Sequence, residues 1–263
     1  LLLAIILFCT LLVTGFGVVT FVRRAEVAAW QGRQSEATRN TARTVANLLE
    51  STQRSLNFIN LVGLDDVAVD KHFLDKLLRQ YPILDEVVYL NSLGEPIAST
   101  TEATLLAESQ ATIIQAPWFT VAQAGQKYYS ELMLAADEEP YLMAAIPAPN
   151  ASVIVARVNM SLLWDFIAES RFGESGLTYI IDSQGKIIAH PDRDVAAKRL
   201  LRERPPWFAD LTFRGIGYGD YVNFQDTRVV AAAAVVPEVN WVVVTELATT
   251  EAFANSRQAY LIL

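Results

Sequence analysis

Residues 171–194 read RFGESGLTYIIDSQGKIIAHPDRD. Two short runs of apolar and β-branched residues, at 177–181 and 186–190, flank the polar sequence Asp182-Ser183-Gln184-Gly185. Asp and Ser side chains favour turns because they bond their own backbone, and Gly adopts a positive φ without steric cost. The stretch therefore predicts a β-hairpin. Pro191 ends its second strand because proline lacks the N–H that a strand ladder requires.

A second copy of this hairpin lies about 90 residues upstream, where residues 88–99, VYLNSLGEPIAS, align with residues 179–190, YIIDSQGKIIAH. Three further pairs keep nearly the same offset: 117–119 with 206–208 (both Pro-Trp-Phe), 144–147 with 234–237, and 152–156 with 241–245. Self-similarity at a fixed period is typical of repeated units. Two unrelated β-rich modules with similar turns are the alternative, but turn chemistry does not account for the Pro-Trp-Phe match. The chain is therefore predicted to contain a tandem duplication.

Composition narrows the class of protein. At 263 residues the chain can hold about two domains with proper cores. The formal net charge is −8 and no basic cluster stands out, which disfavours nucleic-acid binding. Cys9 is the single cysteine, and His72 and His190 lie in different modules, so no metal site is expected. No nucleophile elbow or phosphate loop is present, so we expect neither catalysis nor a cofactor in this chain.

The first 62 residues predict two helical segments. Residues 1–22 are apolar and uncharged and precede Arg23-Arg24, which indicates a transmembrane helix; a signal peptide is the alternative, with a shorter apolar core. Residues 23–62 have the composition of a long stalk helix with one apolar stripe. The stripe consists of Val45, Leu48, Leu49, Thr52, Leu56 and Ile59. It would pack on the same chain or on the identical helix of a second copy, which would give a homodimer.

Two modules are predicted to follow, at residues 63–170 and 171–247. Strands are expected at 127–134, 141–148 and 152–158 after the first hairpin, and at 218–224, 228–236 and 241–247 after the second. Each module would then be a five-stranded antiparallel sheet with flanking helices, an α+β fold. Residues 248–263 are expected to form an exit helix that leads into a second, truncated membrane span.

This order of elements resembles the double Cache (dCache) sensor domain of bacterial transmembrane receptors. Residues 173–192, GESGLTYIIDSQGKIIAHPD, are similar to the membrane-proximal module of that family, and the resemblance extends over roughly residues 25–250. It implies two tandem PAS-like modules, with residues about 24–256 outside the cytoplasm and the chain anchored among the lipids of the inner membrane. It also implies signalling to a cytoplasmic histidine kinase, chemotaxis domain or nucleotide cyclase.

The resemblance also implies a small-molecule site in the membrane-distal module, here the first copy. Amino-acid-sensing members carry Arg-x-Trp-Tyr, then Tyr-x-Asp, then an Asp at the end of the last strand. In this chain Ala116 replaces the Arg, so the bidentate clamp for a carboxylate is missing. A neutral or cationic ligand is therefore expected. The matching positions are the expected ligand-binding residues: Trp118, Phe119, Tyr129, Glu131 and Asn159.

Several alternatives remain open from the sequence. Trp118 and Phe119 recur in the second copy, so they could simply anchor a helix start in the core. Tyr129 and Glu131 share one side of a strand if alternation is regular, although Glu131 could also be solvated. The same fold could serve as a protein-binding or dimerisation module without a small ligand. A membrane-anchored enzyme is the third reading.

Overall fold

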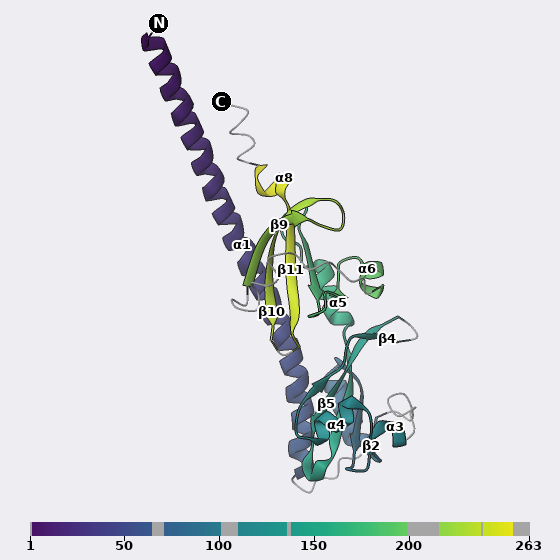
Figure 1. The fold of residues 1–263 in the computed structure, drawn as a ribbon. Helices are drawn as coiled ribbons and strands as arrows, with labels where there is room; N and C mark the ends of the chain where they lie inside the picture. Colours follow the sequence, from purple (N-terminus) through teal and green to yellow (C-terminus); the bar gives the residue numbers. More distant parts are fainter. Residues whose placement is uncertain are drawn as a thin grey trace. The chain divides into compact units, whose positions relative to one another are not determined.

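The computed structural model describes residues 2–64, 71–100, 110–135, 138–198, 216–237 and 239–254. It contains a long N-terminal helix and two antiparallel sheets (Figure 1), so the predicted α+β class is confirmed. The chain divides into two compact units. We call residues Thr44–Phe166 the first module, and Leu1–Arg43 together with Ile167–Leu263 the second module.

Helix α1 (Leu2–Leu64) runs without interruption through 63 residues and contributes to both modules. Its predicted apolar stripe is buried in the first module, where Val45, Leu49 and Leu56 are at most 1% exposed. The stripe thus packs on its own chain. Within the described residues, no helix combines the length and the apolar character needed to cross a membrane, so the span predicted at residues 1–22 is not confirmed.

The first module contains one sheet in the order β2-β1-β6-β5-β3, with β4 pairing β5 as well. Its elements are α2 (Lys71–Gln80), β1 (Leu84–Leu90), β2 (Pro96–Ser99), α3 (Gln110–Ile113), α4 (Pro117–Gln123), β3 (Tyr128–Tyr129), β4 (Met133–Leu134), β5 (Pro140–Pro147), η1 (Pro149–Ala151), β6 (Val153–Asn159) and α5 (Ser161–Glu169), the last of which continues into the second module.

The prediction of five strands in this module was wrong, because the strand expected at 127–134 is split into β3 and β4. The backbone N–H of Met143 donates to the Ser130 hydroxyl at 2.8 Å, while Ser130 N donates to Met143 O at 2.9 Å. A serine side chain that competes for backbone groups disrupts a regular ladder. Pairing with β5 resumes only at Met133.

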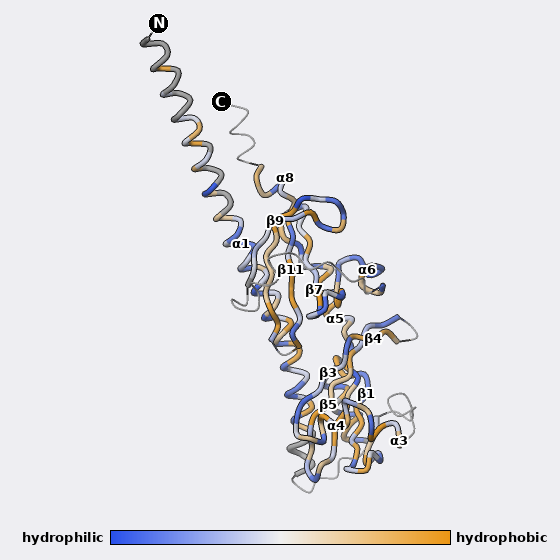
Figure 2. The backbone as a smooth tube through the Cα atoms, viewed as in Figure 1, coloured by the Kyte–Doolittle hydropathy of each residue, from blue (hydrophilic) through white to orange (hydrophobic). Residues whose placement is uncertain are grey.

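The second module has five strands, as predicted, and the structure arranges them in the order β8-β7-β11-β10-β9. Its elements are β7 (Leu177–Ile181), β8 (Ile187–Ala189), α6 (Arg193–Ala197), β9 (Ile216–Val222), β10 (Arg228–Val236), β11 (Trp241–Ala248) and α8 (Thr249–Ala252). Hydrophobic residues are prominent along β10 and β11 in Figure 2. The strand order matches that of the first module, which supports the duplication. The second Pro-Trp-Phe and the predicted second span lie outside the described residues.

The two hairpins use the same turn chemistry. The β-hairpin predicted within residues 171–194 and its copy at residues 88–99 are both confirmed. Asn91 Oδ1 accepts from Leu93 N and Glu95 N, both at 2.9 Å. Asp182 Oδ1 likewise accepts from the backbone two and four residues further on, at 2.8 and 2.9 Å. Gly94 and Gly185 have φ of 77° and 91°, in the left-handed region that favours glycine.

Buried hydrogen bonds attach α1 to one face of the second-module sheet. Gln34 Nε2 donates to Val230 O at 3.0 Å and to Thr245 O at 2.8 Å. The hydroxyl groups of Thr38 and Thr245 lie 2.5 Å apart. These polar side chains are almost fully buried: Gln34 and Thr245 are 1% exposed and Thr38 is 0% exposed. Thr245 therefore marks the face of the sheet that is covered by α1.

Replacement of the Gln34 amide tests this attachment. Gln34→Met should lower the free energy of unfolding by about 1–3 kcal/mol, because two buried hydrogen bonds are lost. Gln31→Met is the matched control; Gln31 is exposed on the same helix, and its replacement should change stability by less than about 0.5 kcal/mol. Urea unfolding of both variants measures the difference. Equal stability of the two variants would contradict the attachment.

Candidate functional site

A hydrophobic cluster covers one face of the first-module sheet. Its buried members are Val88, Leu90, Ile113, Trp118, Phe119, Ala122, Ala145, Val153 and Val155, and Ala116, Tyr128 and Met143 pack against it. Pro117 begins α4, where its missing N–H is no loss. The rings of Trp118 and Phe119 meet edge to face at 5.8 Å and are only 9% and 1% exposed. This aromatic pair is therefore part of the core.

Strand alternation extends this face into a polar region. Val155 lies opposite Val88 on β1 and Ala145 on β5, both cluster members. Side chains two residues apart on a strand share a face. Arg157 and Asn159 of β6 therefore lie on the face that carries the cluster. Arg157 lies opposite Met143, which packs against the cluster, so the polar region and the cluster are adjacent.

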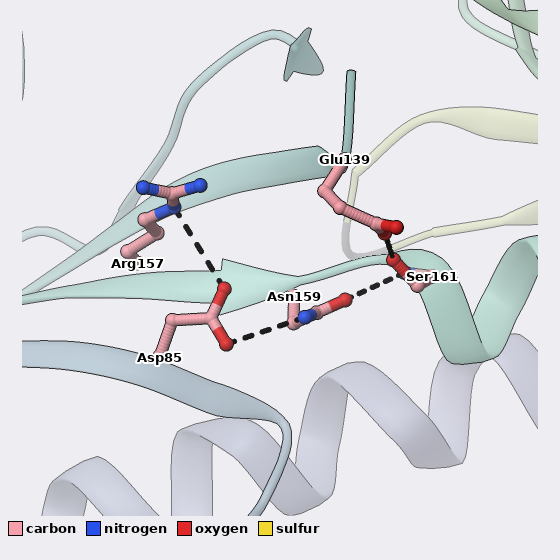
Figure 3. Close-up of polar contacts among 5 residues, drawn as sticks. All are labelled: Asp85, Glu139, Arg157, Asn159 and Ser161. Atoms are coloured by element: carbon pink, nitrogen blue, oxygen red, sulfur yellow. Dashed lines mark hydrogen bonds and ion pairs between the residues drawn. The ribbon is translucent and has the colours of Figure 1, made fainter. Parts of the chain in front are cut away.

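A group of polar side chains converges at this end of the sheet (Figure 3). Asp85 accepts a hydrogen bond from Asn159 Nδ2 at 3.2 Å and lies 3.7 Å from Arg157 Nε. Asn159 Oδ1 in turn accepts from Ser161 N at 2.8 Å, and the Ser161 hydroxyl donates to Glu139. The register between β1 and β6 is irregular at residues 84–86, and such bulges re-aim side chains. We call these five residues the polar patch.

The polar patch is partly open to solvent and carries more acid than base. The side chains of Arg157 and Asp85 are 21% and 35% exposed. The guanidinium of Arg157 also stacks over the Tyr141 ring, 4.3 Å from its centre. Asp85 and Glu139 bring two carboxylates to the patch and Arg157 brings one guanidinium, so the patch favours a neutral or positively charged partner. Tyr128, Tyr141 and Met143 add half-buried apolar surface beside it.

The structure brings only some of the sequence-predicted residues together. Asn159 lies in the polar patch, and Trp118 and Phe119 lie in the adjacent cluster. Tyr129 lies opposite Ala144 and thus on the other face, whereas Tyr128 packs against the cluster. Glu131 is exposed in the irregular segment between β3 and β4.

Sequence reasoning missed Arg157 and Asp85. Arg157 could have been noticed, because it is the one charged residue in the otherwise largely apolar run VIVARVN at residues 153–159. For Asp85 the sequence offered no comparable signal, because its direction depends on the irregular pairing of β1 with β6.

A second polar centre is buried in the second module around Glu246, which is 2% exposed. Glu246 follows Thr245 on β11 and so points to the face opposite α1. Its carboxylate accepts from the hydroxyl groups of Tyr179, at 2.7 Å, and Tyr221, and from Asn223 Nδ2 at 2.8 Å. Three donors compensate the buried charge, as buried carboxylates require. We call these four residues the Glu246 network.

Two tyrosine hydroxyls in the Glu246 network resist ionisation. Burial first, and then the charge of Glu246, raises the pKa of both Tyr179 and Tyr221 well above the usual value of 10.0. Among the described residues, no group of three or more His, Cys, Asp or Glu side chains could hold a metal ion. The hydrogen bonds of the Glu246 network stabilise the core of its module.

Alkaline unfolding tests the Glu246 network. The tyrosine pKa is higher in the folded state than in the unfolded state, where it is about 10. The resulting contribution to stability is complete below pH 10 and is lost as the pH rises from 10 toward the folded-state pKa, because the unfolded state then releases its protons more readily. The free energy of unfolding should fall by up to about 1.4 kcal/mol per pH unit for each of the two tyrosines. The double variant Tyr179→Phe/Tyr221→Phe should lose most of this slope, measured by urea unfolding at pH 9, 10 and 11. Tyr218→Phe, at an exposed tyrosine, should keep it; an unchanged slope in the double variant would refute the assignment.

Comparisons with known proteins place this geometry in a family. The family model for the Cache domain matches residues 26–256, most of the chain. None of the curated proteins matches the sequence. Solved structures share the fold at low sequence identity. The ligand-binding domain of the Pseudomonas fluorescens chemoreceptor CtaA, in complex with L-isoleucine, has a TM-score of 0.66 and 15% identity and aligns over 89% of this chain and 98% of its own.

Two further structures show the same architecture. The ligand-binding domain of Mlp24 with asparagine has a TM-score of 0.63 and 15% identity over 90% of this chain and 99% of its own. The extracellular domain of the histidine kinase soHK1S-Z6 has a TM-score of 0.62 and 18% identity over 89% of this chain and 99% of its own. Together with the duplicated sheets, the family match shows that this chain belongs to the double Cache (dCache) family of sensor domains.

Proposed function

We propose that this chain is the extracytoplasmic ligand-sensing domain of a bacterial transmembrane receptor and that its first module binds a small molecule at the polar patch. The observation that carries this proposal is the polar patch itself, where hydrogen-bonding groups from β1, β6, α5 and Glu139, the residue before β5, converge beside the hydrophobic cluster. Small-ligand sites combine apolar walls with a few converging polar groups. Family membership supports a sensing role, since structures of related fold are ligand complexes of chemoreceptors.

The ligand should be neutral or carry a positive charge. Ala116, the residue before α4, supplies no cation, and Arg157 already lies beside Asp85. An ammonium group would pair with Asp85 and hydrogen-bond to Asn159, while an apolar portion would rest on the half-buried rings nearby. The relatives bind ligands that carry amino groups: PctB was solved with L-Gln and with L-Arg, and PctC with GABA.

Signal output is part of the same proposal. Ligand binding would favour one of two packed arrangements of the module, and helix α1, which contributes to both modules, would pass the change toward the membrane. The output would be a cytoplasmic partner such as a histidine kinase, and this sensor domain would itself be non-catalytic. A homodimer through α1 is also proposed. It would use the helix face that the buried stripe leaves exposed, which carries for example Phe58 at 49% exposure.

A ligand screen with paired variants tests the proposed site. Amines should raise the melting temperature of the protein, whereas simple organic acids should not. Asp85→Asn should weaken a cationic ligand about tenfold or more, since loss of a hydrogen bond to a charged group costs about 1.5–3 kcal/mol. Glu131→Gln is the matched control and should leave affinity unchanged, because Glu131 is exposed between β3 and β4. If Glu131→Gln weakens binding and Asp85→Asn does not, the site suggested by the family motif is the correct one. Stabilisation by carboxylates alone would refute both.

Membrane topology is a separate test of the receptor proposal. Residues about 24–256 are proposed to lie outside the cytoplasm. Alkaline phosphatase fused after Gly125 or after Gly185 should be active, because this reporter folds only after export. Fluorescent protein fused at the same two positions should stay dark if the segment is exported through the general secretion route. Bright cytoplasmic fluorescence from either fusion would rule out the proposed topology.

A further inference from the structure

A cavity of about 270 Å³ lies in the second module, bounded by α1, β9, β10 and the residue that follows α8. Its walls include Trp30, Gln31 and Gln34 of α1, Tyr218 and Asp220 of β9, and Phe253. We call it the α1 pocket. It is separate from the polar patch, which belongs to the first module.

The α1 pocket lies on the sheet face that α1 covers. Tyr218 pairs with Ala232, and Ala232 pairs with Thr245, whose hydroxyl contacts Thr38 of α1. Directly paired residues in antiparallel strands share a face, so Tyr218 and Asp220 point toward α1. The Glu246 network occupies the opposite face and does not contribute to the pocket.

Contacts with neighbouring residues hold the walls of the α1 pocket in place. Gln34 is fixed by its two hydrogen bonds to the sheet. Trp30 is stacked by the Arg33 guanidinium, 4.2 Å from the ring centre, and meets the edge of Phe172 at 5.8 Å. A wall that is already ordered loses little entropy when a ligand arrives.

The chemistry of the α1 pocket favours a cation with an apolar body. Trp30, Tyr218 and Phe253 supply aromatic surface, and aromatic faces attract cations. Asp220 supplies a carboxylate that is 47% exposed. It pairs with Arg228 through contacts of 2.9 and 3.3 Å, but Arg228 is 69% exposed. A pair that is so open to water contributes little energy and can be displaced.

From these contacts we infer that the α1 pocket is a second binding site, independent of the polar patch, for a small organic cation that carries about one aromatic ring. The ammonium group takes the place of Arg228 at Asp220, and the ring lies against Trp30, Tyr218 and Phe253. The volume is near the lower end for ligand sites, which limits the occupant to this size. The occupant touches α1 and Phe253 together, two segments about 220 residues apart in the chain.

Three probes of similar size test the ligand class: benzylamine, benzyl alcohol and benzoate, titrated calorimetrically into the whole chain. Benzylamine should bind most tightly and benzoate least. Asp220→Asn should weaken benzylamine about fivefold, a reasonable effect for one partly exposed charge pair. Phe253→Ala should weaken benzylamine and benzyl alcohol alike, because it removes a wall. Asp226→Asn, in the turn of the same hairpin, is the matched control and should change nothing.

Arg228→Gln gives the decisive result, because it should act in the opposite direction. It removes the competitor of the ligand for Asp220, so benzylamine should bind more tightly, whereas a damaged fold would weaken binding. Weaker binding in Arg228→Gln, equal binding of benzylamine and benzoate, or no binding of any probe would overturn the inference. Asp85→Asn, which changes the polar patch, should leave benzylamine binding at the α1 pocket unchanged. A failure of the proposed ligand site at the polar patch can therefore be distinguished from a failure of the proposed site at the α1 pocket.

Discussion

One helix serves both modules, and the rest of the structure depends on how its side chains are divided between them. From Gln34 to Thr38, α1 presents buried polar groups to the second-module sheet. From Val45 onward it presents a buried apolar stripe to the first module. The two kinds of contact have different physical consequences. Apolar packing tolerates small displacements, whereas hydrogen bonds to fixed carbonyl groups depend on distance and angle. The second module therefore holds the helix in one position more strictly than the first.

The duplicated sheets place opposite charges at corresponding positions. In the first module, Val155 on β6 pairs with Val88, and Arg157 lies two residues further along the strand. In the second module, Val244 on β11 pairs with Tyr179, and Glu246 lies two residues further along. Arg157 and Glu246 therefore occupy corresponding positions. The guanidinium in the first module remains partly open to solvent beside its acid partner. The carboxylate in the second module is buried and has three donors. The same fold thus leaves polar groups partly open to solvent in one copy and uses them for internal cohesion in the other.

Local chemistry explains what could be predicted from the sequence. The two hairpins could be predicted because the side chains of Asn91 and Asp182 accept hydrogen bonds from the backbone of their own turns. The glycines that follow adopt the positive φ that these turns require. The duplication follows from the repeated landmarks. Side-chain direction could not be predicted in the same way. Tyr129 pairs with Ala144 and so points away from the face that carries Trp118, and Ser130 then interrupts the strand before Glu131. Asp85 joins the polar patch only through an irregular pairing of β1 with β6, and such pairing depends on tertiary packing.

The hydrogen bonds of Gln34 and Thr38 also restrict how far α1 can slide along its own axis. One helical turn is about 5.4 Å, or nearly four residues. A slide of one turn in one direction would bring Trp30 to the buried place of Gln34, where an indole does not fit. A slide in the other direction would bring Ala42 to the place of Thr38, where a methyl group cannot bond the Thr245 hydroxyl. Both alternative registers are unfavourable, so the movement of α1 that the proposed signalling requires is limited to a shift smaller than one turn, or to a tilt.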